Sequence, residues 1–312
     1  MDVRKIIRFG KSSFVISLPK SWLKKHNLQK GDLLTLEEGT HQLVIKAREH
    51  ATPLVLEKKV IQANGKEISR IRSEIIAAYL AGYDIIKIIG MNLKPHAKEI
   101  KETLHNLAGI ELLEQDNTNI LAKTLLNSEE ISIPILVRRM DNIIRTMFQN
   151  NFEHEPSEVL LERDMDVNRL FYLVHRVMNA ALDNPPLLQK LKLTHTGLQK
   201  HMKITGYLES IGDYLKRISR NLQRAKVTKE EKEKILDVLK HLYAQYILAM
   251  KAYHTENTEL AFQVELGYKN SMEKCNAVHN LVTGLPSTEL VYNLKSMCAA
   301  IKKIVRTLTV EI

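Results

Sequence analysis

Residues 10–32 have the sequence GKSSFVISLPKSWLKKHNLQKGD, and this stretch decides how the N-terminal part of the chain folds. Apolar residues alternate from Phe14 to Leu18, which predicts a short strand that Pro19 ends. Residues 20–26 then predict a short basic helix, and Gly31 lies in a turn that leads to the next strand. The stretch therefore predicts a small, positively charged platform.

Three further strands flank this platform. The pattern predicts them at residues 3–9, 33–37 and 42–47, the last two joined by a hairpin turn at residues 38–40. Four short strands and one helical turn bury too little apolar surface to be stable alone. The N-terminal part is therefore expected to need a partner chain or a ligand.

The positive charge of the protein is concentrated at its N-terminus. Residues 1–30 contain eight Lys and Arg residues against one acidic residue, Asp2, so they carry +7 of the total net charge of +10. The rest of the chain carries only +3. Such concentration favours a local surface that binds a polyanion over a generally basic protein.

The N-terminal region resembles the SpoVT/AbrB (MazE-like) swapped-hairpin DNA-binding domain. The motifs that carry the resemblance are Gly10-Lys11-Ser12, Val15–Lys20 and Leu28–Asp32. The resemblance implies that two copies intertwine their hairpins into one β-barrel, so the protein is a homodimer that presents basic residues to double-stranded DNA. The implied DNA-binding residues are Arg4, Arg8, Lys11, Lys20, Lys24 and Lys25. The alternative is a barrel that only dimerises, with lysines that are merely solvated.

Length and composition set the rest of the expectation. We expect a multidomain protein: a small N-terminal β-barrel at residues 1–50, a small central α/β domain at 53–128 and an all-α domain at 130–312. No run of about 18 apolar residues appears, so we expect no membrane insertion. Cys275 and Cys298 are the only cysteines and lie in helical patterns, which indicates reduced thiols in a cytoplasmic protein.

The central region alternates strand and helix patterns. We expect strands at 54–61, 84–89, 110–114 and 120–125 and amphipathic helices at 67–81 and 95–108. These elements would form a small α/β layer. Gly65 and Gly90 are isolated and form no phosphate-binding loop, so a structural spacer or a dimerisation module is the favoured interpretation.

The C-terminal region is predicted to be helical throughout. The six expected helices are 131–152, 157–183, 197–225, 229–255, 258–283 and 288–309. Their short connections favour antiparallel packing in two three-helix bundles, residues 130–226 and 227–312. Pro185-Pro186 marks one break, and Thr228–Glu231 has the pattern of a capping box.

Acidic residues four positions apart recur in the helical region. The candidate pairs are Glu209 with Asp213, Glu162 with Asp166, and Asp164 with Asn168. Side chains at this spacing share a helix face, and carboxylates placed so can jointly bind a metal ion. The alternative is that Glu209 and Asp213 form ion pairs with Lys216, Arg217 or Arg220.

Two of these motifs resemble those of the PhoU family, whose paired three-helix bundles can hold metal clusters. Glu209–Asp213 matches the Glu-x-Ile-Gly-Asp pattern of the family. Asp164–Leu170 matches its Asp-x-x-Val-Asp-Arg-Leu pattern except at Asn168, where the family has a second Asp. The resemblance implies a divalent or trivalent metal, Fe, Zn, Mg or Ni, as the one possible cofactor.

The whole chain resembles archaeal PhoU-family phosphate-uptake regulators that carry an N-terminal SpoVT/AbrB domain. This implies a DNA-binding transcriptional regulator of phosphate uptake whose helical domain receives the signal. The alternatives are an adaptor that does not bind DNA and docks on a phosphate ABC transporter ATPase or a sensor kinase, and a carboxylate metal-binding enzyme. Since no Glu-x-x-His motif appears in the helical region 130–312, and no Gly-x-Ser-x-Gly or Walker-type motif appears in the sequence, we expect no enzymatic activity.

Overall fold

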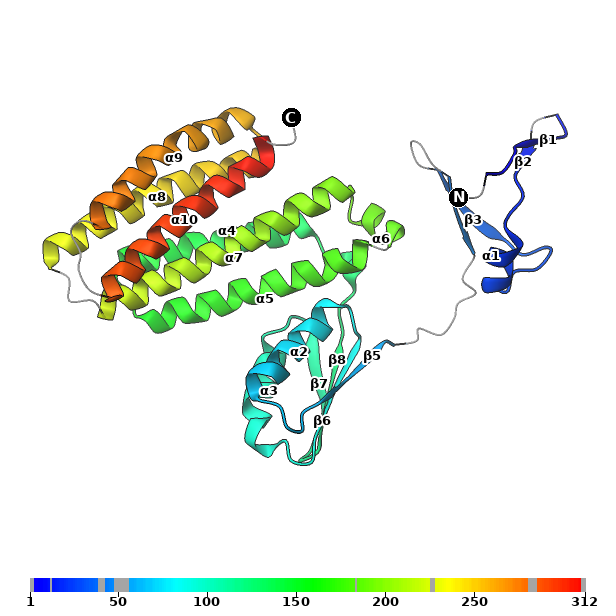
Figure 1. The fold of residues 1–312 in the computed structure, drawn as a ribbon, viewed down its shortest axis with the longest axis horizontal. Coiled ribbons are helices and arrows are strands. Elements are labelled where there is room, and N and C mark those ends of the chain that lie inside the picture. The colour runs from blue at the N-terminus through cyan, green and yellow to red at the C-terminus, as the bar shows by residue number, and fades with distance from the viewer. Residues whose placement is uncertain are drawn as a thin grey trace. The chain divides into compact units, whose positions relative to one another are not determined.

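The computed structural model divides the chain into two units, Met1–Val55 and Leu56–Ile312 (Figure 1). The residues that it describes are 3–11, 13–38, 43–47, 56–182, 184–224, 228–279 and 285–309. The central α/β region and the helical region, which the sequence predicts as separate domains, both lie in the second unit.

The first unit contains two antiparallel strand pairs and one short helix. Its elements are β1 (Ile7–Phe9), β2 (Ser13–Val15), α1 (Lys20–Lys25), β3 (Leu34–Glu38) and β4 (Leu43–Ala47). β1 pairs with β2 and β3 with β4, so the described strands of one chain form two separate ribbons. Gly10 and Gly31 occupy turns with φ of 72° and 100°, a left-handed conformation that favours glycine. The turn predicted at residues 38–40 lies outside the described residues apart from Glu38.

The first unit has no buried side chain among its described residues. Large apolar side chains that would normally form a core are open to solvent: Phe9 is 69% and Phe14 is 68% exposed. The others are Val3, Ile6, Ile7, Val15, Ile16, Leu33, Leu36 and Leu43. One copy of this unit therefore lacks the apolar burial that would stabilise it.

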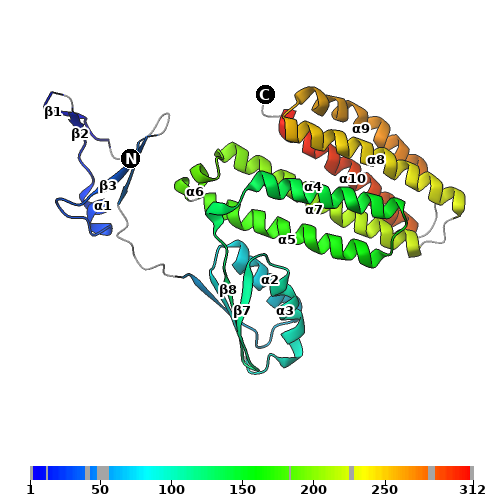
Figure 2. The same cartoon turned by 180° about the vertical axis from the view of Figure 1, so that it is seen from behind.

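The central region of the second unit is a four-stranded mixed sheet with helices on one face (Figures 1 and 2). Its elements are β5 (Lys58–Gln62), α2 (Ile68–Leu80), β6 (Ile85–Ile89), the 3₁₀ turn Lys94–His96, α3 (Ala97–His105), β7 (Ile110–Gln115) and β8 (Asn119–Thr124). The strand order is β5-β6-β8-β7, with β5 parallel to β6 and the other pairs antiparallel. Ile86, Ile88, Ile120 and Ala122 alternate along β6 and β8 and are buried, so this face forms the core beneath α2 and α3.

A buried arginine joins this region to the helices. Arg176 donates hydrogen bonds to the carbonyls of Tyr79 at 2.5 Å and Gly82 at 2.9 Å, and Asn179 donates to the carbonyl of Leu80 at 3.0 Å. These carbonyls lie at the C-terminal end of α2, where no intrahelical donors remain. The contact therefore satisfies one helix end while it packs α2 against the helical region.

The helical region follows the predicted order with one addition. After the 3₁₀ turn Ser128–Glu130 come α4 (Ile133–Phe152), α5 (Ser157–Leu182), α6 (Pro185–Lys190), α7 (His195–Arg224), α8 (Lys229–Thr255), α9 (Thr258–His279) and α10 (Leu285–Thr309). The capping box is confirmed: Glu231 N–H donates to Thr228 Oγ1 at 3.2 Å, and Thr228 N–H donates to Glu231 Oε2 at 2.6 Å. None of the helices in the described ranges is long and apolar enough to cross a membrane.

The short helix α6 is absent from the sequence prediction. Pro185 and Pro186, which indicate a break, instead occupy the first turn of this helix. Backbone N–H groups of the first turn make no intrahelical hydrogen bond, so the missing N–H of proline is tolerated there. Asn184 caps the helix by accepting a hydrogen bond from the Leu187 N–H at 3.2 Å.

The two groups of three long helices share one apolar core. Leu208, Ile211, Leu215 and Ile218 lie three or four residues apart and form the buried seam of α7. The same core continues through α8, α9 and α10. Figures 1 and 2 show α10 running between α7 and α9. Within each predicted group of three every long helix contacts the other two, and α7 packs along α10, so the two groups share one continuous core.

Candidate nucleic-acid interface

The basic residues of the first unit occupy exposed positions. Arg4 precedes β1, Arg8 lies on β1, Lys11 lies in the β1–β2 turn, and Lys20, Lys24 and Lys25 belong to α1. All six side chains are exposed. Across the described part of the chain, no ion pair engages Arg8, Lys11 or the three α1 lysines. Their charges are therefore available to an external anion.

The local structure of α1 fixes where its lysines lie. Pro19 is the N-cap residue in an extended conformation, which is the backbone geometry that starts a helix. At the other end, the rings of Trp22 and His26 pack with centroids 4.9 Å apart. Lys20 and Lys24 are four residues apart and share one face of the helix. The helix thus presents a compact group of cations on a half-buried Trp22 anchor.

In the second unit, α5 and α7 bring acidic residues together. The Lys216 ammonium lies between two carboxylates, donating to Asp164 Oδ2 at 2.5 Å and to Asp213 Oδ1 at 2.7 Å. Arg217 donates to Asp213 Oδ2 at 2.8 Å, and Asn168 donates to Asp164 Oδ2 at 3.2 Å. The ion pairing predicted for Asp213 with Lys216 and Arg217 is confirmed.

The remaining acidic candidates divide between this cluster and solvent. Glu209 is half-buried on the same helix as Asp213, whereas Glu162 and Asp166 are exposed on α5. In α5 the positions two residues apart face different directions, so Asp164 turns inward while its neighbours turn outward. The structure therefore brings together four of the six residues that the sequence proposed as metal ligands.

Burial and mutual repulsion shape the titration of this cluster. Burial raises the pKa of Asp164 despite the hydrogen bond from Lys216. Burial also raises the pKa of Glu209, and the negative charges of Asp213 and Asp164 add to the rise. Burial lowers the pKa of Lys216, but hydrogen bonds to Asp164 and Asp213 outweigh it and leave that pKa raised. The cluster holds three carboxylates, Asp164, Asp213 and Glu209, against two cations, Lys216 and Arg217.

These residues do not fit a metal site in the observed arrangement. Within the described ranges, no group of three or more His, Cys, Asp or Glu side chains is placed to hold a metal ion. The ammonium of Lys216 takes the position between Asp164 and Asp213 that a metal would need. The side-chain amide of Asn168 donates a hydrogen bond to Asp164. The geometry is that of a partly buried ion-pair network.

A second buried network was not anticipated from the sequence. Asp141 on α4 is 2% exposed and accepts hydrogen bonds from Arg145 Nε and Nη2, both at 2.9 Å, and from Tyr246 Oη at 2.8 Å. His254 Nε2 lies 3.1 Å from Asp141 Oδ2. Burial alone would raise the pKa of Asp141, but the hydrogen bonds from His254, Arg145 and Tyr246 hold it below its ordinary value. The four-residue spacing of Asp141 and Arg145 is the one sequence feature that could have indicated this network.

The chain thus combines an exposed basic region, whose described residues include no buried side chain, with a large, well-packed helical body. The family that matches the chain is described as antidote-toxin recognition MazE, bacterial antitoxin, and its match covers residues 7–52. No curated protein matches the chain, and no solved structure does. The match supports a MazE/AbrB-like N-terminal domain, the kind found in DNA-binding or antitoxin-type regulators. It confirms the resemblance predicted for the first part of the sequence.

Proposed function

We propose that this protein is a homodimeric, DNA-binding transcriptional regulator. The observation that carries the proposal is the exposed basic surface of β1 and α1 in a region that matches the MazE family. Among the described residues these cations have no ion-pair partner, and the first unit has no buried side chain. The helical body would receive the signal that controls DNA binding. The proposal assigns no catalytic step to the chain.

The apolar surface of the first unit supports dimerisation. Burying an exposed Phe, Leu or Ile side chain contributes roughly 2 kcal/mol each. Phe9, Phe14 and the other exposed apolar residues of the two ribbons offer many such side chains to a second copy. Intertwined ribbons would cover them without the help of the helical body. Dimerisation would also place two copies of the α1 lysines on one surface.

The charge distribution supports double-stranded DNA as the ligand. A dimer would present Arg8, Lys11, Lys20, Lys24 and Lys25 twice, and each phosphate contact releases condensed counterions. The affinity should therefore fall steeply as salt concentration rises. Phosphate contacts of this kind position the protein, so sequence preference would depend on additional contacts to bases or on DNA shape.

The finer proposal is that the regulated process is phosphate uptake. It is supported by the resemblance of Glu209–Asp213 to a PhoU motif and by the pairing of that motif with Asp164 across α5 and α7. In this proposal the PhoU-like helical body communicates phosphate status to the DNA-binding head. Genome-wide DNA occupancy in phosphate-rich and phosphate-poor cells tests both parts together.

The direct test is DNA binding by a charge-reversal variant. Lys24→Glu combined with Lys25→Glu should weaken binding to duplex DNA by about a hundredfold or more and flatten its salt dependence. The matched control is Lys203→Glu with Lys229→Glu, two exposed lysines of the helical body. Fluorescence anisotropy over a salt series measures both effects. Wild-type affinity and salt slope in the Lys24/Lys25 variant would show that the assigned surface is wrong.

The rival function is an adaptor that dimerises through the same region but binds no DNA. Such a protein would dock on a phosphate ABC transporter ATPase or a sensor kinase. Absence of DNA retardation at low salt, together with recovery of transporter or kinase subunits in a pull-down, would favour the adaptor. Retardation that is lost in the Lys24/Lys25 variant would favour the regulator.

A further inference from the structure

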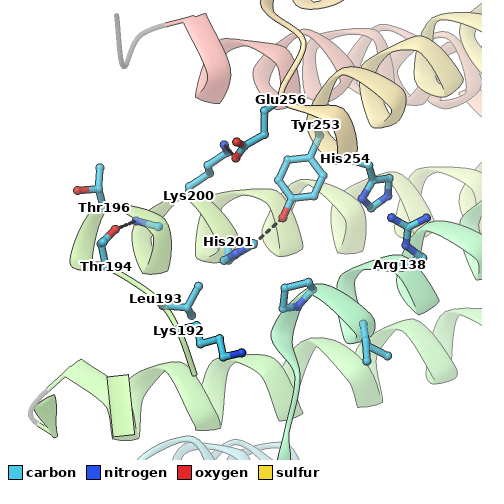
Figure 3. A pocket seen from close by; sticks show the side chains of 13 residues that line it. Arg138, Lys192, Leu193, Thr194, Thr196, Lys200, His201, Tyr253, His254 and Glu256 are labelled. Atoms are coloured by element: carbon cyan, nitrogen blue, oxygen red, sulfur yellow. Dashed lines mark hydrogen bonds and ion pairs between the residues drawn. The ribbon is translucent and has the colours of Figure 1, made fainter. Parts of the chain in front are cut away.

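The helical body contains an open cavity of about 560 Å³ that plays no part in the proposed DNA interface. It lies where the start of α4, the start of α7 and the end of α8 meet (Figure 3). Cavities of 300–1,000 Å³ are typical of small-molecule sites. Three separate segments of the chain contribute to its walls, so it exists only in the folded helical body.

The lining of this cavity is rich in cations. Arg138 from α4, Lys192 from the α6–α7 connection and Lys200 from α7 all line it, and Glu256 is the one carboxylate among the lining residues. Lys200 Nζ lies 3.2 Å from Glu256 Oε1, so this pair is internally compensated. Arg138 and Lys192 are exposed and have no ion-pair partner in the described part of the chain. The cavity therefore carries two uncompensated positive charges.

The N-terminal end of α7 adds to the positive potential. Thr194 and Thr196 line the cavity at the start of this 30-residue helix. The Thr194 hydroxyl accepts a hydrogen bond from the Gly197 N–H at 3.0 Å, which caps the helix. A helix N-terminus carries a partial positive charge and favours anions. The carboxyl end of α8 forms a different wall of the cavity. The cation-rich wall is formed by α4, the α6–α7 connection and the start of α7.

Two neutral polar rings complete the wall and connect the two helix groups. His201 Nδ1 lies 2.5 Å from Tyr253 Oη, joining α7 to α8. Burial, with a smaller effect of the Lys200 charge, lowers the pKa of His201 to about 4, so this imidazole is neutral at pH 7. Next to it, His254 contacts the buried carboxylate of Asp141 on α4 at 3.1 Å. Figure 3 shows His201 facing Tyr253, with His254 beside Arg138.

We propose that this cavity binds a phosphate-bearing small molecule and that the bound ligand ties α8 to α4 and α7. Two uncompensated cations and a helix N-terminus recognise phosphate oxygens through charge-assisted hydrogen bonds. The volume exceeds what a single inorganic phosphate ion would fill, which favours a nucleotide-sized ligand. Binding itself is independent of the DNA interface; its effect on DNA affinity rests on the proposed function.

Isothermal titration calorimetry of the full-length protein with AMP, ATP and inorganic phosphate, at constant ionic strength, tests the ligand class. We expect saturable binding of at least one of the nucleotides that sodium sulfate at equal ionic strength does not reproduce. Saturation by inorganic phosphate alone would retain the phosphate site and reject the nucleotide-sized ligand. Failure of all three probes to bind would overturn the proposal.

A pair of variants places the binding in this cavity. Arg138→Gln and Lys192→Gln should each weaken binding about tenfold, since each removes one charge-assisted contact. Arg139→Gln is the matched control, because Arg139 is the exposed neighbour of Arg138 but does not line the cavity. Both target side chains are exposed, so thermal unfolding should be unchanged in all three variants. Equal affinity of the Arg138, Lys192 and Arg139 variants would overturn the assignment.

The same ligand added to a DNA-binding titration gives the regulatory readout. A shift in DNA affinity that disappears in the Arg138→Gln variant would connect the cavity to the proposed function. Ligand binding by a protein that never binds DNA would leave the cavity assignment standing and reject the DNA-binding function. The two failures are therefore distinguishable.

Discussion

The two units of this protein differ in how much of their apolar surface is buried within one chain. The second unit, Leu56–Ile312, has two extensive buried cores and a buried hydrogen-bond network around Asp141. The first unit, Met1–Val55, has no buried side chain among its described residues, although Phe9, Phe14 and Leu36 are as apolar as any core residue. The apolar side chains of the first unit are thus free to pack against the second copy that we propose, whereas those of the second unit are largely buried within one chain.

The largest effect is expected where an apolar side chain of the first unit becomes charged. Phe14→Asp would place a carboxylate where a second copy is proposed to pack, so dimerisation and DNA binding should both be lost. Sedimentation equilibrium and DNA retardation measure these outcomes. Leu266→Asp, at a position 82% exposed on α9, is the control and should leave both unchanged. A dimeric, DNA-binding Phe14→Asp protein would contradict the proposed role of this surface.

The next effect concerns the buried network at the junction of α4 and α8. Asp141→Ala removes the acceptor of Arg145, Tyr246 and His254 and should lower the free energy of unfolding by about 3 kcal/mol. Urea unfolding followed by circular dichroism measures this loss. Asp237→Ala, an Asp on α8 for which no ion pair is seen among the described residues, serves as the comparison and should cost far less. Equal losses of unfolding free energy in the two variants would show that the Asp141 network does not stabilise the protein.

Removing the ammonium of the acidic cluster between α5 and α7 should lower the free energy of unfolding by a smaller amount. Lys216→Met leaves Asp164 and Asp213 without their shared ammonium and should cost about 2 kcal/mol at neutral pH. The cost should shrink in acid, because protonation of Asp164, whose pKa burial raises, removes the uncompensated charge. Thermal unfolding of both proteins at neutral and acidic pH measures this change. Stabilisation of wild-type protein by a divalent metal that Asp164→Asn abolishes would instead support a metal site.

The smallest predicted effect is a pH dependence carried by Asp141. Its folded-state pKa lies below the ordinary value, so its stabilising contribution is complete above pH of about 4 and is lost as pH falls through the folded-state pKa. The difference in unfolding free energy between wild type and Asp141→Asn should therefore be constant near neutral pH and decline only in strong acid. A decline that begins near neutral pH would mean that another group controls it.

Local features of this protein were predictable because their interactions are local. Pro19, Gly31 and the Thr228–Glu231 capping box act within a few residues of chain, and the structure shows each of them at the end or turn that the sequence indicates. The periodic leucines and isoleucines of α7 likewise predict its buried face. The concentrated charge and the motifs of residues 10–32 also predict the domain that the family match supports.

Long-range arrangement was decided by the tertiary structure. Lys216 reaches Asp164 from 52 positions away, and Tyr246 reaches Asp141 from 105 positions away, so no spacing rule connects them. The cavity that Arg138 and Lys200 line is set by how α4, α7 and α8 pack. Most helices and strands and the basic N-terminal region followed from the sequence alone, because backbone hydrogen bonding and side-chain periodicity are local; the short helix α6 did not. Only packing decided which charges meet, because a charge is neutralised by its neighbours in space.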